Sequence, residues 1–135
     1  MKTPLDVPVG GELTRTCVLW EDEVVRGRFL PGAEVTLEDA RENVAATARI
    51  TKGRRRPVLV DLRAIRSQSA DARAYFAGPD ATQVSLAVAL LIGSPLSRAI
   101  GNFYLGFNRP AMPTRLFTDE RAALEWLRVQ ESSAR

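Results

Sequence analysis

Apolar and polar positions follow two different periods along this chain. Residues 13–20 and 24–30 predict two strands, close enough in sequence to pair antiparallel. In the first, Thr14, Thr16, Val18 and Trp20 share one face, and in the second Val25, Gly27 and Phe29 do. Two nearly continuous apolar runs, 57–62 and 86–92, are typical of buried parallel strands. A last short strand is predicted at 115–117, so the pattern indicates five strands.

Helical spacing of apolar residues separates the later strands. A capping-box-like sequence opens the first predicted helix, which spans 36–51. Further helices are predicted over 69–77, 94–107 and 118–130. The order β-β-α-β-α-β-α-β-α predicts an α/β fold, with a mainly parallel five-stranded sheet covered by four main helices.

Length and composition fit one domain. The chain has 135 residues, of which 45% are apolar and 26% charged, and this size leaves little room for a second core. We expect a loose N-terminal segment over 1–12, a single domain over 13–130 and a frayed tail over 131–135. The predicted core residues are Val44, Val58, Leu59, Val60, Leu86, Val88, Leu90, Ile92, Ile100, Phe103 and Leu127.

Composition excludes several kinds of chemistry. The chain has no histidine and one cysteine, Cys17, so it lacks the residues for Ser-His-Asp or Cys-His catalysis and for an internal disulfide. We expect neither a metal site nor a bound cofactor. No apolar run reaches the roughly 20 residues of a membrane span, and no secretory signal is readable at the N-terminus, so a cytoplasmic location is expected.

Charge gives little support to nucleic-acid binding. The 19 basic and 16 acidic residues leave a net charge of +3, which is typical of a mixed solvated surface. The run Arg54–Arg56 has no interleaved aromatic residue and precedes Pro57. We therefore predict that this run solvates a turn between a helix and a strand, and that nucleic acid is not a partner.

The segment Val58–Ile65 carries a resemblance to a known family. Its apolar strand ends in Asp61-Leu62, and the aliphatic residue Ile65 follows three positions later. Together with the order of elements, this resembles the STAS domain, the fold of bacterial anti-sigma factor antagonists of the SpoIIAA type. The chain looks closest to the divergent SpoIIAA-like proteins that are often labelled STAS/SEC14-like. The resemblance implies a strand order of 1-3-2-4-5 with an antiparallel first strand at the edge.

The turn after this segment departs from the family pattern. Where STAS antagonists carry Asp-Ser-Ser/Ala-Gly at the start of a helix, this chain has Ser69-Ala70-Asp71-Ala72. In those antagonists the corresponding serine switches partner binding, and its phosphorylation adds about two negative charges. Asp71 stands in place of the second serine, so we predict that binding is not controlled by phosphorylation there; Ser69, then Ser67, is the best remaining acceptor. The alternative is that Ser69 is only a helix N-cap.

Two further sets of residues are candidates for binding. Ser94, Ser97 and Arg98 follow a buried strand and open a helix, where free N–H groups can bind an anion, although a plainly capped helix is the alternative. Tyr104 and Leu105 lie off the inward stripe of that helix. They are candidates for an exposed interaction patch, with core packing as the alternative.

These observations favour a non-enzymatic, STAS-type regulatory or protein-interaction module, which binds its partner through the helix start at Ser67–Asp71 and the adjacent loops. The resemblance implies a protein partner, of the anti-sigma factor or kinase kind, or a second copy of the chain. The alternative is a module that binds a small apolar or anionic ligand, as the SEC14-like label implies. An enzyme is the least favoured class, because no nucleophile lies beside a readable base.

Overall fold

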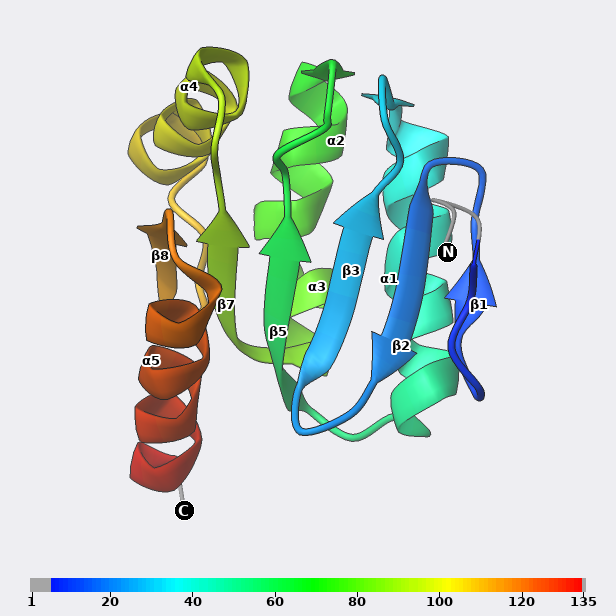
Figure 1. Cartoon of the computed structure of the whole chain (residues 1–135), viewed down its shortest axis with the longest axis vertical. Helices are drawn as coiled ribbons and strands as arrows, with labels where there is room; N and C mark the ends of the chain where they lie inside the picture. The colour runs from blue at the N-terminus through cyan, green and yellow to red at the C-terminus, as the bar shows by residue number, and fades with distance from the viewer. Residues whose placement is uncertain (1–5, 135) are drawn as a thin grey trace.

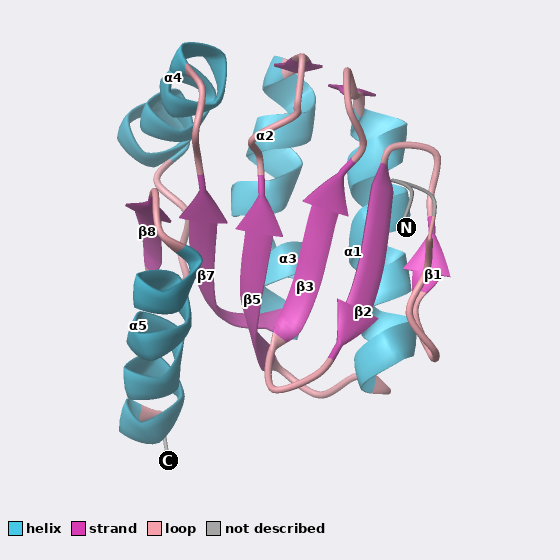
Figure 2. Cartoon of the chain, viewed as in Figure 1, coloured by secondary structure: helices cyan, strands magenta, loops and turns pink. Residues whose placement is uncertain are grey.

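Six strands form one mixed sheet whose spatial order follows the chain (Figures 1 and 2). The computed structural model describes residues 6–134. The strand bounds are Glu12–Leu13 (β1), Cys17–Glu21 (β2), Val25–Phe29 (β3), Arg56–Asp61 (β5), Ser85–Leu91 (β7) and Thr114–Phe117 (β8). Strands β1, β2 and β3 pair antiparallel, and β3, β5, β7 and β8 pair parallel, so the sheet is mainly parallel as predicted.

The number of strands differs from the prediction of five. The predicted strand 13–20 is broken by a turn, in which the Thr14 hydroxyl accepts hydrogen bonds from the backbone N–H groups of Thr16 and Cys17 at 3.3 and 3.0 Å. Residues 14–16 are three polar residues in succession, and the predicted strand runs through them. The break adds β1 as a sixth strand of the main sheet.

The strand order 1-3-2-4-5 implied by the family resemblance is wrong. The five predicted strands lie side by side in chain order. The short connection between β2 and β3 explains the difference, because Asp22–Val24 returns the chain directly into an antiparallel pair. Two further strands, β4 (Glu34–Val35) and β6 (Ser67–Gln68), form a small parallel sheet of their own.

Helices cover both faces of the main sheet (Figure 1). Their bounds are Leu37–Thr51 (α1), Ala70–Ala77 (α2), Pro79–Val84 (α3), Pro95–Phe103 (α4), Tyr104–Asn108 (η1, a π-helical turn) and Glu120–Ser133 (α5). Helices α1 to α4 lie on one face and α5 lies on the other. Residues 6–134 thus hold five α-helices rather than the predicted four, because α3 is too short for its periodicity to be visible.

Local sequence explains where the long helices begin and end. Thr36 and Asp39 form the predicted capping box of α1, and the helix ends at Lys52 and Gly53 in the left-handed conformation, with φ of 55° and 77°. Helix α5 continues to Ser133, so it includes three residues of the tail predicted over 131–135. Residues 1–5 and 135 lie outside the described part of the chain.

The core consists of two apolar clusters, one on each face of the sheet. The larger cluster, under α1 to α4, includes Phe29 and Ile92. The smaller cluster lies under α5 and includes Leu127. Most predicted core residues are buried, and three are only half-buried, namely Val60, Leu86 and Ile100.

Phe103 was expected in the core, but its side chain is 47% exposed. Helix α4 instead faces the sheet with Ser97 and Gly101, and η1 continues this buried side with Tyr104. Gly101 allows a close approach, since a Cβ at this position would lie 2.7 Å from Cδ2 of Leu116. The apolar stripe that includes Phe103 therefore lies on the outer side of the helix.

Candidate interaction site

Three helices begin at the edge of the sheet where its parallel strands end. Helices α1, α2 and α4 all start there, close to the small sheet of β4 and β6 (Figure 1). Each has a hydroxyl side chain as its N-cap, supplied by Thr36, Ser69 and Ser94. This carboxyl edge is where α/β folds usually place their binding sites.

The predicted switch residues Ser67, Ser69 and Asp71 lie together at the start of α2. Ser67 is exposed on β6. The Ser69 hydroxyl accepts a hydrogen bond from the N–H of Ala72 at 3.2 Å and donates one to Oδ1 of Asp71 at 2.5 Å. The hydrogen bond from Ser69 is the main reason that the pKa of Asp71 lies below its ordinary value. Ser69 is thus an N-cap, and a switching role for this cluster stays a prediction.

Asp71 lies in the first turn of α2 and is exposed. It therefore stands beside the loop, as the comparison with STAS antagonists requires. A carboxylate is also favourable at this place because partial positive charge collects at a helix N-terminus.

Ser94, Ser97 and Arg98 differ in what they offer to a ligand. Ser97 is fully buried, and its hydroxyl oxygen accepts hydrogen bonds from the N–H groups of Gly93 and Ser94 at 3.0 and 2.9 Å. Ser94 and Ser97 together form a capping box. Ser97 therefore has no free side for an anion. The Ser94 hydroxyl is also engaged, because it accepts from the N–H of Ser97 and donates to Ser97 Oγ, both at 3.0 Å. Of the three predicted residues, the exposed Arg98 is the one whose side chain can still support the anion site.

The predicted exposed patch at Tyr104 and Leu105 does not exist, and the neighbouring phenylalanines are exposed instead. Tyr104 is 7% exposed and Leu105 is half-buried, whereas Phe103 and Phe107 are 47% and 72% exposed. The prediction that Tyr104 is exposed is wrong, because α4 and η1 bury the side that carries small residues. An exposed patch does exist on this segment, but the two phenylalanines form it.

Phe103 and Phe107 stack on each other with their ring centroids 5.0 Å apart. The guanidinium carbon of Arg73, from α2, lies 4.5 Å from the Phe103 ring centroid, which is a cation–π distance. Leu96, on the same side of α4, is 46% exposed. We call the surface of Leu96, Phe103, Phe107 and Arg73 the aromatic face.

The aromatic face is built mainly on a segment without negative charge. Residues 81–118 contain three arginines and no aspartate, glutamate or lysine. The rest of the chain is neutral overall, with 16 basic and 16 acidic residues, so the whole net charge of +3 lies in this segment. The sequence alone shows this asymmetry, and it is the signal that points to residues 81–118.

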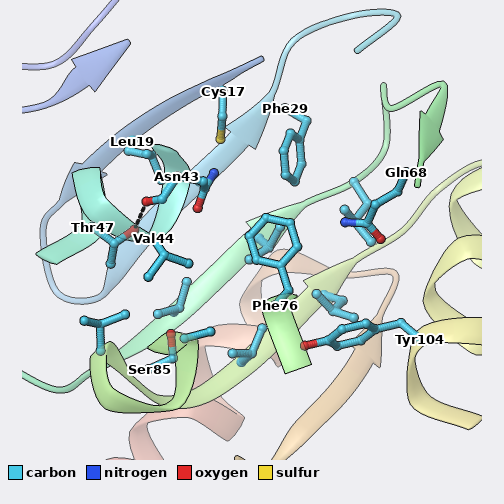
Figure 3. Close-up of a pocket in the computed structure, with 18 of the residues that line it drawn as sticks. Cys17, Leu19, Phe29, Asn43, Val44, Thr47, Gln68, Phe76, Ser85 and Tyr104 are labelled. Atoms are coloured by element: carbon cyan, nitrogen blue, oxygen red, sulfur yellow. Dashed lines mark hydrogen bonds between the residues drawn. The ribbon is translucent and has the colours of Figure 1, made fainter. Parts of the chain in front are cut away.

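A cavity of about 70 Å³ lies between the sheet and helices α1 to α4 (Figure 3). Its walls include Phe29, Val44, Phe76 and Val88, and none of its lining residues is charged. The side chain of Tyr104 points into it (Figure 3). No sequence pattern predicts this cavity, because its lining residues come from many separate elements.

Arg54 and Arg55 lie in the predicted turn between α1 and β5, and Arg56 is the first residue of β5. The side chains of Arg54 and Arg55 donate to backbone carbonyls at 2.7 and 2.8 Å. Arg56 forms ion pairs with Glu21, at 2.8 Å, and with Glu131. All three arginines are thus engaged within the fold, and the prediction that they bind no nucleic acid stays a prediction.

Cys17 is buried, and this burial raises the pKa of its thiol to about 12. Such a thiol is a packed apolar group rather than a nucleophile. Among residues 6–134, no three histidine, cysteine, aspartate or glutamate side chains are grouped to hold a metal ion. No helix in the same range is long and apolar enough to cross a membrane.

Comparison with solved structures identifies the fold. An uncharacterised protein of the DUF3478 family from Shewanella loihica PV-4, described as having a SpoIIAA-like fold, is similar with a TM-score of 0.57 and 18% identity, over 82% of this chain and 91% of that chain. A protein of unknown function from Arthrobacter sp. FB24 has 33% identity over 87% of this chain and 98% of that chain, with a TM-score of 0.31. No curated protein matches the chain.

The Shewanella structure shows that the present chain has a SpoIIAA-like fold, as its sequence predicted. A family model described as "Domain of unknown function (DUF7793)" matches residues 18–130, which is most of the chain and includes the aromatic face and the cavity. The chain therefore belongs to the DUF7793 family and is a divergent member of the SpoIIAA-like fold.

Proposed function

We propose that the chain is a non-enzymatic, STAS-type regulatory module of the bacterial cytoplasm, which binds a partner protein through the aromatic face. The observation that carries this proposal is the exposure of the stacked pair Phe103 and Phe107, at 47% and 72%. Exposed apolar groups that gather in one place are typical of interaction sites. Aromatic residues and arginine are also the types most enriched at the centres of protein interfaces.

Charge indicates what kind of partner fits this surface. The net charge of +3 is confined to residues 81–118, which carry the two phenylalanines. Interfaces usually pair complementary potentials, so the proposed partner presents an acidic segment with apolar side chains. A second copy of this chain is disfavoured as the partner, because a symmetric contact would bring two positively charged segments together.

Arg73 connects the aromatic face to the predicted switch residues. Its Nη1 donates to the carbonyl of Gln68 at 2.7 Å while its guanidinium lies over the Phe103 ring. Its backbone N–H donates to the carbonyl of Ser69 at 3.0 Å, so Ser69 and Arg73 are one helical turn apart. A phosphate on Ser69 would compete with Phe103 for the guanidinium. We therefore propose that phosphorylation of Ser69 changes how the aromatic face binds.

A peptide selection tests this proposal. A random-peptide display library would be selected against the purified chain and against the double variant Phe103→Ser/Phe107→Ser. We expect the wild-type chain to enrich acidic peptides with apolar residues, and the double variant to bind them at least about 10-fold more weakly, as loss of an interface centre does. Val129→Ser is the matched control, because Val129 is 59% exposed on α5, on the opposite face of the sheet.

Three outcomes would contradict the proposal. In the first, the selected peptides show no excess of acidic residues. In the second, they bind the double variant as tightly as they bind the wild-type chain. In the third outcome the chain would bind vesicles of anionic lipid through the same phenylalanines and bind no peptide, which would make the partner a membrane surface. Thermal melts of each variant show whether it is folded, and an exposed position such as Phe107 should have little effect on them.

A further inference from the structure

The cavity behind the aromatic face is lined by Tyr104, a buried tyrosine whose hydroxyl has no hydrogen-bond partner in the described part of the chain. The Tyr104 side chain is more than nine-tenths buried and points into the cavity (Figure 3). Its hydroxyl forms no hydrogen bond with any residue between 6 and 134. Burial alone raises the pKa of this hydroxyl, so it stays a neutral donor at physiological pH. The hydroxyl oxygen is not one of the fully buried side-chain atoms that lack a partner, so a molecule in the cavity can reach it and accept its hydrogen bond.

The walls of the cavity define what can occupy it. They are mainly apolar, and none of the lining residues is charged. A charged molecule placed there would lose its hydration without gaining an ion pair, so the occupant is neutral. Asn43, Gln68 and Phe76 are half-buried lining residues from α1, β6 and α2.

The volume limits the size of the occupant. At about 70 Å³ the cavity has roughly half the volume of an apolar cavity that accepts benzene. A molecule of about three to five heavy atoms matches this space. One oxygen on such a molecule would satisfy the Tyr104 hydroxyl, while its hydrocarbon part would contact Val88 and Ile100.

We propose that this cavity binds a small, neutral, mainly apolar molecule with one carbonyl or hydroxyl oxygen, and that the Tyr104 hydroxyl donates a hydrogen bond to that oxygen. The site differs from the predicted anion site at Ser94 and Arg98, because the cavity has no positive charge. It also differs from the aromatic face, although Tyr104 directly follows Phe103 along the chain.

Titration of the isotope-labelled chain with defined probes, followed by two-dimensional NMR, tests the proposal. 2-Butanone represents the proposed class, xenon fills apolar space without a hydrogen bond, and n-butylammonium adds a charge at similar size. The key variant is Tyr104→Phe, which removes only the unpartnered hydroxyl. Tyr75→Phe is the matched control, because the Tyr75 hydroxyl donates to Asp80 at 3.1 Å and does not line the cavity.

We expect 2-butanone to produce saturable shifts at lining residues such as Val44 and Val88, and n-butylammonium to produce none. Tyr104→Phe should weaken 2-butanone binding by about 3- to 10-fold, the usual contribution of one hydrogen bond, and leave xenon binding unchanged. Tyr75→Phe should leave both unchanged.

Several outcomes would overturn the proposal. No saturable shift with 2-butanone or xenon would mean that the cavity holds only water. Equal binding of n-butylammonium would contradict a site for neutral molecules. An unchanged 2-butanone affinity in Tyr104→Phe would remove the proposed anchor, and shifts confined to Phe103 and Phe107 would place the binding on the aromatic face instead.

Discussion

At the scale of single residues, Asp39 shows what local sequence predicts and what it does not. Its spacing from Thr36 predicts the capping box that the structure contains. The same carboxylate also accepts a hydrogen bond at 2.8 Å from Nε of Arg15, which lies 24 residues earlier. That second partner depends on how the turn between β1 and β2 packs against α1, so no spacing rule reveals it.

The pairing of Asp39 predicts a dependence of stability on pH. The hydrogen bond from Arg15, followed by those from Thr36, holds the pKa of Asp39 below its ordinary value of 3.8. The carboxylate therefore stabilises the fold above about pH 4, and this contribution is lost as the pH falls through the lowered pKa of the folded state. We expect Asp39→Asn to unfold more easily at neutral pH, by about 1–3 kcal/mol, and to lose less further stability in acid than the wild type.

Urea unfolding at several pH values between 2 and 7 measures this difference. Glu38→Gln is the control, because Glu38 is a neighbouring carboxylate with a 79% exposed side chain. It should leave both the stability and its pH dependence nearly unchanged. Parallel losses in acid for wild type and Asp39→Asn would show that Asp39 is not the responsible group.

At the scale of elements, the helical periodicity of apolar residues located α4 correctly, but it predicted the wrong face of this helix to be buried. The rule that the apolar stripe of a helix faces inward fails here because α4 packs through its small residues Ser97 and Gly101. The backbone of α4 lies close to the sheet, so this helix packs without burying large side chains of its own. The predicted patch failed for the same reason, since Tyr104 belongs to the packed side and Phe103 to the free side. The small residues Ser97 and Gly101, four positions apart, were a signal for the buried face. A prediction based only on large apolar residues does not use it.

The close packing of α4 predicts the effect of enlarging Gly101. A Cβ at this position would lie 2.7 Å from Leu116 and 3.6 Å from Cγ2 of Ile92, so there is no room for a longer side chain. We expect Gly101→Leu to lower the free energy of unfolding by about 1–3 kcal/mol or more, the usual effect of overpacking. Ala99→Leu, at an exposed position of the same helix, should change it by less than about 0.5 kcal/mol. Equal midpoints for the two variants in denaturant melts would disprove the packing argument.

At the scale of the whole molecule, the alternation of strands and helices was sufficient to predict a mainly parallel sheet covered by helices. The order of its strands was taken from the family resemblance and was wrong, although the short turn at Asp22–Val24 already favoured a simple hairpin. The cavity could not be predicted, because a gap in packing depends on side-chain shapes from many elements. The sequence thus predicted the sheet and its covering helices, but not the cavity between them.

The separation of the core into two clusters predicts additive effects. Leu90 belongs to the cluster under α1 to α4, and Leu127 belongs to the cluster under α5. Each change, Leu90→Ala or Leu127→Ala, should cost about 2–5 kcal/mol because it leaves a cavity in a packed core. The sheet lies between the two side chains, so the double variant should lose the sum to within about 0.5 kcal/mol. Chemical denaturation of the four proteins measures this. A coupling above about 1 kcal/mol would mean that the clusters form one core.

The match between chain order and spatial order has a consequence for synthesis on the ribosome. Each new strand emerges next to the strand that is already in place, so the nascent sheet can grow from β1 towards β8 without waiting for a distant partner. The face that carries Leu59 and Leu91 has no such advantage, because its cover, α5, follows all six strands of the main sheet along the chain. Until α5 has been synthesised and has packed, the completed sheet exposes one apolar face to solvent. That is the stage at which a chaperone would bind this protein and at which aggregation would compete most strongly with folding.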